Sequence, residues 1–173
     1  MSQSGRPVVV GVFSGQHPLV VATAAEYARR FDAELVCAHV DAGRYVLTEH
    51  PDGSIVSIST DPEYPDERAE QVDPDLAAWL HEQLDTAGVA WSCRALAGSF
   101  VDALGHLAET IDAAMIVVGT RQPGVAGSLR EFFNGSVAAH LVHRQSRPVV
   151  VVPLSPVKNE ASLPWRDTEP RPA

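Results

Sequence analysis

The chain has 173 residues, of which 45% are hydrophobic and 20% are charged, and its formal net charge at pH 7 is -9. This length and composition predict one globular domain with enough apolar surface for a core. So acidic a chain is a poor electrostatic match for nucleic acid or an anionic membrane, and we expect neither as a partner. The N-terminal segment lacks a signal-peptide pattern, and no apolar run approaches the roughly 20 residues that span a bilayer, so we expect a cytoplasmic protein.

The first segments alternate strand with helix. The runs RPVVVGV at 6–12 and AELVCAHV at 33–40 each predict a strand, and apolar residues at helical spacing over 17–31 predict a helix between them. Cys37 and Cys93 lie in apolar segments, and we expect two inert buried thiols instead of a disulfide, a redox pair or a zinc site.

The pattern breaks between 41 and 75, where ten acidic residues, two basic residues and four prolines fall. Such a stretch is long for a loop, which points to function or mobility. The run GSIVSIST at 53–60 alternates weakly and could form one arm of a hairpin. We favour the other interpretation, a solvated and partly disordered acidic insertion at about 41–73 within a domain that spans 6–154.

Regular patterning returns after the insertion. The sequence predicts helices over 73–88, from Ser99 as the capping residue, and over 136–145. It predicts strands over 89–98, 113–119 and 147–154. The tail at 155–173 contains four prolines and few apolar residues, so we expect it to stay outside the core.

This alternation predicts an α/β fold, with a parallel sheet that carries helices on both faces. In such sheets, ligands bind beyond the carboxyl ends of the strands, where the strand order reverses. If the first and fourth predicted strands are central neighbours, the crevice is lined by FSGQ at 13–16 and by a glycine-rich loop, VVGTRQPGVAGSLREFFNGSV at 117–137.

The loop contains the groups that a phosphate site needs. A helix that begins at Gly135 or Ser136 directs backbone N–H groups and its positive dipole end into the crevice. Gly119 allows close backbone approach, and Arg121 offers a full positive charge. Each feature has an ordinary alternative, since Gly119 can simply end a strand, Ser136 can only cap a helix and Arg121 can be a solvated cation.

A standard P-loop is excluded. The spacing from Gly119 to Gly124 fits one, but Val125 and Ala126 occupy the positions of its lysine and hydroxyl residue. The seven histidines are scattered, and His140 and His143, which share a helix face, have no third ligand within sequence reach, so the histidines predict no metal site.

Four segments together resemble the universal stress protein domain, from about Arg6 to Pro153: VVVGV, AHV, MIVVGT and NGSVAAHLV followed by RPVVVVP. The resemblance implies a five-stranded parallel sheet of order 3-2-1-4-5. It implies a homodimer paired through the last strands, here Val149, Val150, Val151 and Val152. It also implies that ATP, with magnesium, or AMP binds between the first and fourth strands, as in many members.

The loop departs from the pattern of nucleotide-binding members, G-x2-G-x9-G-S/T. Gly119 matches its start, and Gly135 and Ser136, followed by Val137, match its end. Fifteen residues, 120–134, lie between the outer glycines, which is three more than the pattern has. Val125 stands at the second glycine, so a rearranged turn would have to use Gly124 or Gly127 there.

A second departure concerns Phe13, which stands where binding members carry an aspartate that accepts hydrogen bonds from the nucleotide. Its ring could stack on adenine or fill the pocket. Val40 matches a position whose backbone contacts adenine. We therefore predict a regulatory module of the universal stress type that senses adenine nucleotide as a signal. The alternatives are a dimeric scaffold that binds a protein partner through the acidic insertion and tail, and a slow ATPase.

Overall fold

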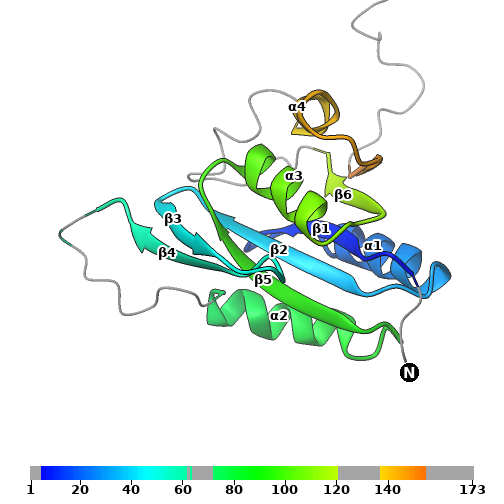
Figure 1. The fold of residues 1–173 in the computed structure, drawn as a ribbon. Helices are drawn as coiled ribbons and strands as arrows, with labels where there is room; N and C mark the ends of the chain where they lie inside the picture. Colours follow the sequence, from blue (N-terminus) through cyan, green and yellow to red (C-terminus); the bar gives the residue numbers. More distant parts are fainter. Residues whose placement is uncertain (1–4, 62, 64–71, 121–136, 155–173) are drawn as a thin grey trace, which may run out of the picture.

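The computed structural model describes residues 5–61, 63, 72–120 and 137–154. Its main sheet has the strand order β5-β2-β1-β6-β7, and every pairing within that sheet is parallel. This is the predicted order 3-2-1-4-5 once the two inserted strands are set aside, so the predicted fold is confirmed (Figure 1). In chain order the elements are β1 (Val8–Val12), α1 (Pro18–Arg30), β2 (Leu35–Asp41), β3 (Arg44–Glu49), β4 (Ile55–Ser59), α2 (Pro74–Leu84), β5 (Trp91–Ala97), α3 (Phe100–Thr110), β6 (Met115–Gly119), α4 (Val137–Arg144) and β7 (Val149–Val152).

The sheet separates two apolar clusters. The side chains of Val8, Val10 and Val12 pack with α1 and α2, whereas Val9 packs with α3 and α4. Every residue of β1 is buried, because this central strand is covered on both faces and paired on both sides. The helices therefore lie on both faces, as predicted (Figure 1).

The helices begin at the predicted signals. Asp73 accepts hydrogen bonds from the backbone N–H groups of Asp75 and Leu76, with Pro74 in the first turn of α2. Ser99 precedes α3, but it makes no side-chain cap; its hydroxyl hydrogen-bonds to the Asp102 carboxylate instead. The position of this helix start was predicted correctly, and the capping contact was not.

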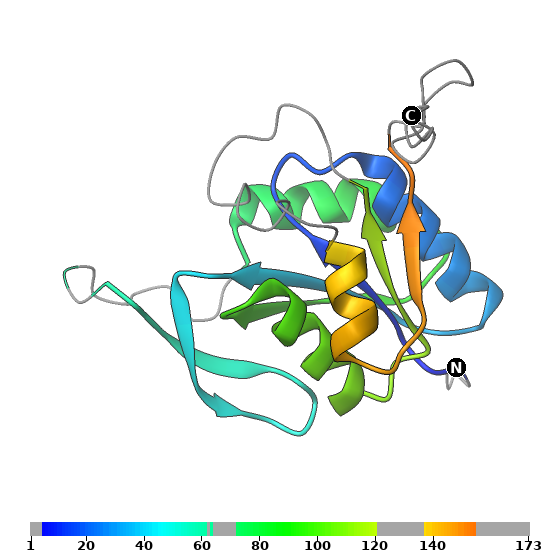
Figure 2. The same cartoon turned by 90° about the horizontal axis from the view of Figure 1, so that it is seen from above.

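The insertion contains an antiparallel hairpin of β3 and β4, paired from Arg44 opposite Ser59 to Glu49 opposite Ile55. The hairpin interpretation therefore holds for 44–59 in place of the favoured one, a solvated and partly disordered insertion, although the side chains of β3 are mostly exposed. The hairpin lies beside α3, outside the five-stranded sheet (Figure 2). Glu49 fixes it there by hydrogen bonds with His106, at 2.6 Å, and Thr110, at 3.1 Å.

The two cysteines are neighbours across β2 and β5, in register, and both are free thiols. Burial raises the pKa of the Cys93 thiol to about 11 and raises the pKa of Cys37 as well. Both groups are thus protonated at neutral pH, and an unreactive thiol is what the sequence led us to expect. Among the helices of the described ranges, none is both long and apolar enough to cross a bilayer.

Candidate functional site

A crevice forms where β1 and β6 part at their carboxyl ends. The pairing of β1 with β6 stops at Val10 opposite Val117, whereas its pairing with β2 continues to Val12 opposite His39. This is the point at which the strand order reverses, and ligands of open α/β sheets bind at such points. The structure therefore contains the crevice that the sequence predicted.

A tight turn follows β1 and leads into α1. The backbone N–H of Gln16 donates to the carbonyl of Phe13 at 3.2 Å, and Gly15 has a φ of 81°, a left-handed conformation that favours glycine. The turn carries Gln16 back beneath the end of β1, where its Nε2 donates to the Gly11 carbonyl at 2.9 Å. Only 6% of Gln16 is exposed.

Inside the crevice is a small cavity of about 20 Å³. Its walls are the ends of β1 and β6, Gln16, Val20, the first residues of α3 and α4, and Leu154. This volume holds about one water molecule, whereas ligand pockets are more than tenfold larger. The cavity between these described residues is thus too small for a nucleotide.

Two aromatic rings fill it. Phe13 and Phe100 both line the cavity and are each 8% exposed. A Cβ at Gly11 would lie 2.7 Å from Cζ of Phe100, so the Phe100 ring occupies the space that glycine leaves above β1. Of the two roles considered for Phe13, filling of the pocket matches its burial. The sequence analysis gave Phe100 no place in the crevice.

The other described candidates take different positions. Gly119 lies against α1 and the end of β7, since a Cβ there would be 2.8 Å from Cγ2 of Val20 and 3.2 Å from Cδ1 of Leu154. Packing therefore requires its lack of a side chain. Val137 is buried and lines the cavity as the first residue of α4. Val40 is buried in the apolar cluster that contains Val9 and packs with α3 and α4. It lies one residue beyond the end of the β1–β2 pairing.

The remaining predicted site residues lie outside the described residues: Arg121, Gly124, Gly127, Gly135 and Ser136. Their contacts with phosphate stay predictions. Within the described ranges, no group of three or more His, Cys, Asp or Glu side chains is placed to hold a metal ion. The binding of magnesium together with ATP stays a prediction.

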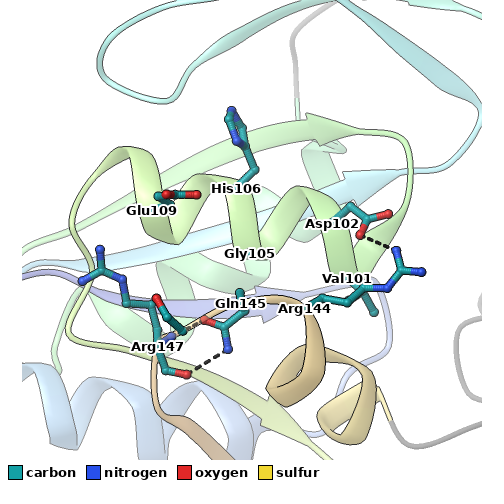
Figure 3. Close-up of a pocket in the computed structure, with 9 residues that line it drawn as sticks. Val101, Asp102, Gly105, His106, Glu109, Arg144, Gln145 and Arg147 are labelled. Carbon is teal, nitrogen blue, oxygen red and sulfur yellow. Dashed lines mark hydrogen bonds and ion pairs between the residues drawn. The ribbon is translucent and has the colours of Figure 1, made fainter.

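A second hollow, of about 390 Å³, lies between α3 and the end of α4 (Figure 3). Its lining is polar, and both of its arginines are in ion pairs: Arg144 binds Asp102 at 2.8 Å, and Arg147 binds Asp112, which lies outside the lining, at 2.8 Å. The Arg144 guanidinium, with the Ser99 hydroxyl, lowers the pKa of Asp102. Sequence reasoning missed this hollow. Its charges compensate one another, so we take the crevice as the candidate site.

Comparisons with solved structures agree on the fold. A universal stress protein from Archaeoglobus fulgidus is 22% identical, with 84% of this chain and 92% of that chain covered and a TM-score of 0.55. A universal stress protein in complex with cAMP is 24% identical, over 87% of this chain and 98% of that one, with a TM-score of 0.56. The Archaeoglobus fulgidus protein in complex with dAMP is 21% identical, over 84% and 96%, with a TM-score of 0.56.

At these identities the structural likeness shows the fold alone. Among curated proteins, no sequence match was found. The model of the universal stress protein family matches residues 5–153, which is most of the chain. By that match, and with the sheet order its fold requires, the chain belongs to the universal stress protein family.

Proposed function

We propose that this chain is a regulatory module that takes up an adenine nucleotide, AMP or ATP, in the crevice between β1 and β6. The observation that carries the proposal is the parting of β1 and β6 directly beside Val137, where α4 begins. The first N–H groups of a helix have no partners within it, and they favour an anion. Members of the family with the same fold have been solved in complex with cAMP and with dAMP.

Binding at this site requires a rearrangement, because a cavity of about 20 Å³ cannot admit a nucleotide. The Phe13 and Phe100 rings must move apart or swing out. Phe100 is the first residue of α3, the helix that carries the hairpin through His106 and Thr110. A nucleotide that displaces the Phe100 ring would therefore also affect α3 and the hairpin attached to it. This coupling would allow nucleotide binding to act as a signal.

The slow-ATPase alternative has weaker support. Phosphoryl chemistry needs a base or a metal-binding carboxylate near the phosphates. The described residues that line the cavity include no Asp, Glu or His. Glu131, a carboxylate of the glycine-rich loop, lies outside the described residues.

Native mass spectrometry and calorimetry with AMP, ATP and ATP plus magnesium test the proposal. We expect wild-type protein to carry one nucleotide per chain, and Val137→Phe to carry none, because the added ring projects into the cavity. Val142→Phe is the matched control, since Val142 lies on the same helix but is exposed. A thermal melt checks that both variants fold. A wild-type protein that stays bare at millimolar ATP would contradict the proposal.

The same spectra report the oligomeric state. We propose a homodimer through β7, whose four valines form an edge of the sheet in this chain, next to β6 alone among the described strands. An uncovered apolar edge strand promotes pairing with another chain. The cytoplasmic location expected from the sequence stays a prediction.

A second function is favoured by the hairpin. Tyr45 lies opposite Ile58 across the two strands, and both are exposed, as is Leu47. Exposed apolar groups that lie together mark protein-binding surfaces. A bare dimer at millimolar nucleotide would favour this scaffold function, in which the hairpin binds a protein partner.

A further inference from the structure

The buried end of Gln16 is incompletely satisfied. Its Nε2 donates to the Gly11 carbonyl at 2.9 Å, but its Oε1 is buried and has no hydrogen-bond partner among the described residues. A buried polar atom without a partner is rare in folded proteins, because removal from water costs free energy that only a new hydrogen bond recovers. The side chain therefore calls for a donor from outside the described residues.

The orientation of the amide follows from its partner. The Gly11 carbonyl can only accept, so the NH₂ end of Gln16 must face it and the Oε1 end must face elsewhere. The turn at 13–16 and the start of α1 fix the backbone on either side of this side chain. Gln16 also lines the crevice cavity, together with Phe13 and Gly11. The Oε1 acceptor of Gln16 thus lines the same cavity as the ring of Phe13. Phe13 stands where the nucleotide-binding members of the family carry an aspartate, which is also an acceptor.

We infer that Gln16 is a ligand-binding residue of the crevice, whose Oε1 accepts a hydrogen bond from an O–H or N–H group of the bound nucleotide. The inference rests on the proposed nucleotide function. It assigns to Gln16 the accepting role that the Phe13 side chain cannot perform. Because the amide is uncharged, it accepts without adding negative charge near an anionic ligand.

The chemistry limits which part of the nucleotide meets Gln16. Phosphate oxygens are mostly ionised at neutral pH, so they act as acceptors and are poor donors to Oε1. The donors of an adenine nucleotide are its ribose hydroxyls and the amino group of the base. Gln16 therefore contacts the ribose or the base, and it selects against analogues that lack the contacted donor.

A ligand series combined with one variant tests this. The affinities of wild type and Gln16→Met are measured for AMP, 2′-deoxy-AMP, 3′-deoxy-AMP and the analogue without the 6-amino group. For wild type we expect one of the three analogues to bind about tenfold more weakly than AMP, since a buried acceptor then lacks its donor. For Q16M we expect weaker AMP binding and no further loss with that analogue. Gln83→Met, on α2, is the matched control and should behave as wild type.

The possible outcomes separate the inference from the function on which it rests. If wild type binds no adenine nucleotide, both fail together. If wild type binds but the three analogue-to-AMP ratios are the same in Q16M, only the inference fails, and Gln16 serves to hold Gly11. If Q16M does not fold, a crystal structure of the wild-type complex decides. A ligand donor within about 3.2 Å of Oε1 supports the inference, and a water molecule there overturns it.

Discussion

The crevice and the β3–β4 hairpin place the same kinds of side chain in opposite environments. In the crevice, Phe13 and Phe100 are each 8% exposed, and Phe100 belongs to the apolar cluster on the α3 side of the sheet. In the hairpin, Tyr45 is 65% exposed, and its neighbours Leu47 and Ile58 are exposed as well. The hairpin contacts α3 near its turn, through Glu49 and Gly53, and both of its strands also contact β5. The contribution of an aromatic side chain to stability thus depends on how far it is buried. Truncation of an aromatic residue to alanine should therefore destabilise the protein more in the crevice than in the hairpin.

The largest expected difference is between Phe100→Ala and Tyr45→Ala. Removal of the buried Phe100 ring leaves a cavity above Gly11, and we expect a loss of about 3–5 kcal/mol in the free energy of unfolding. The exposed Tyr45 should cost no more than about 0.5 kcal/mol. Urea denaturation of both variants measures the two losses. The midpoints can be compared if the dependence of the free energy of unfolding on urea concentration is the same as in wild type. Equal losses would mean that Phe100 does not fill the crevice as described.

A smaller difference is expected between two glycines with the same backbone conformation. Gly53 has a φ of 76° and Gly88 a φ of 66°, so replacement by alanine strains both. A Cβ at Gly53 would also lie 2.5 Å from Cδ1 of the buried Leu107, whereas nothing lies within 4 Å of one at Gly88. We expect Gly53→Ala to destabilise the protein by about 1–3 kcal/mol more than Gly88→Ala.

Limited proteolysis gives a second readout for this pair. If the hairpin moves away from α3 to relieve the clash, Gly53→Ala should become sensitive to cleavage within 44–59, and Gly88→Ala should not. Equal stability and equal cleavage in the two variants would show that the hairpin turn does not pack closely on Leu107.

The same contrast explains what could be predicted from sequence. The main strands and helices follow long apolar patterns, and the family's most specific segment, NGSVAAHLV with RPVVVVP, places the fold directly. The hairpin strands β3 and β4 are short and mostly exposed, so little periodicity marks them. Their contacts with the rest of the domain, of Glu49 and Gly53 with α3 and of both strands with β5, join residues distant in sequence.

The candidate site was predictable only in outline. Its location follows from strand order, and the importance of Phe13 follows from the family pattern. The sequence places Gln16 in the turn that lines the crevice but indicates no ligand role, because a glutamine between a turn and a helix start is usually solvated, whereas here it is only 6% exposed. Gly119 was assigned to a ligand, but its neighbours Val20 and Leu154 show that packing already requires a glycine there.

The smallest expected effect concerns the polar attachment of the hairpin. The hydrogen bond from His106, with a further one from Thr110, lowers the pKa of the Glu49 carboxyl. A carboxyl whose pKa is lower in the folded state stabilises the protein at pH values above its unfolded pKa, and this contribution is lost as the pH falls through the folded pKa. We therefore expect Glu49→Gln to be less stable than wild type by about 0.2–1 kcal/mol at pH 6, with the difference lost as the pH falls through the folded-state pKa of Glu49.

Hydrogen exchange locates this loss. In Glu49→Gln, the amides of β3 and β4 should exchange faster at pH 6, while those of β1 and β6 keep their protection, because only the hairpin depends on the contact. Asp102→Asn is the matched control. Arg144 lowers the pKa of the Asp102 carboxyl too, and Asp102 lies on α3, as His106 and Thr110 do. Among the described residues, however, Asp102 makes no contact with the hairpin. If both variants loosened the hairpin equally, α3 as a whole, and not the Glu49 contact, would be what holds it.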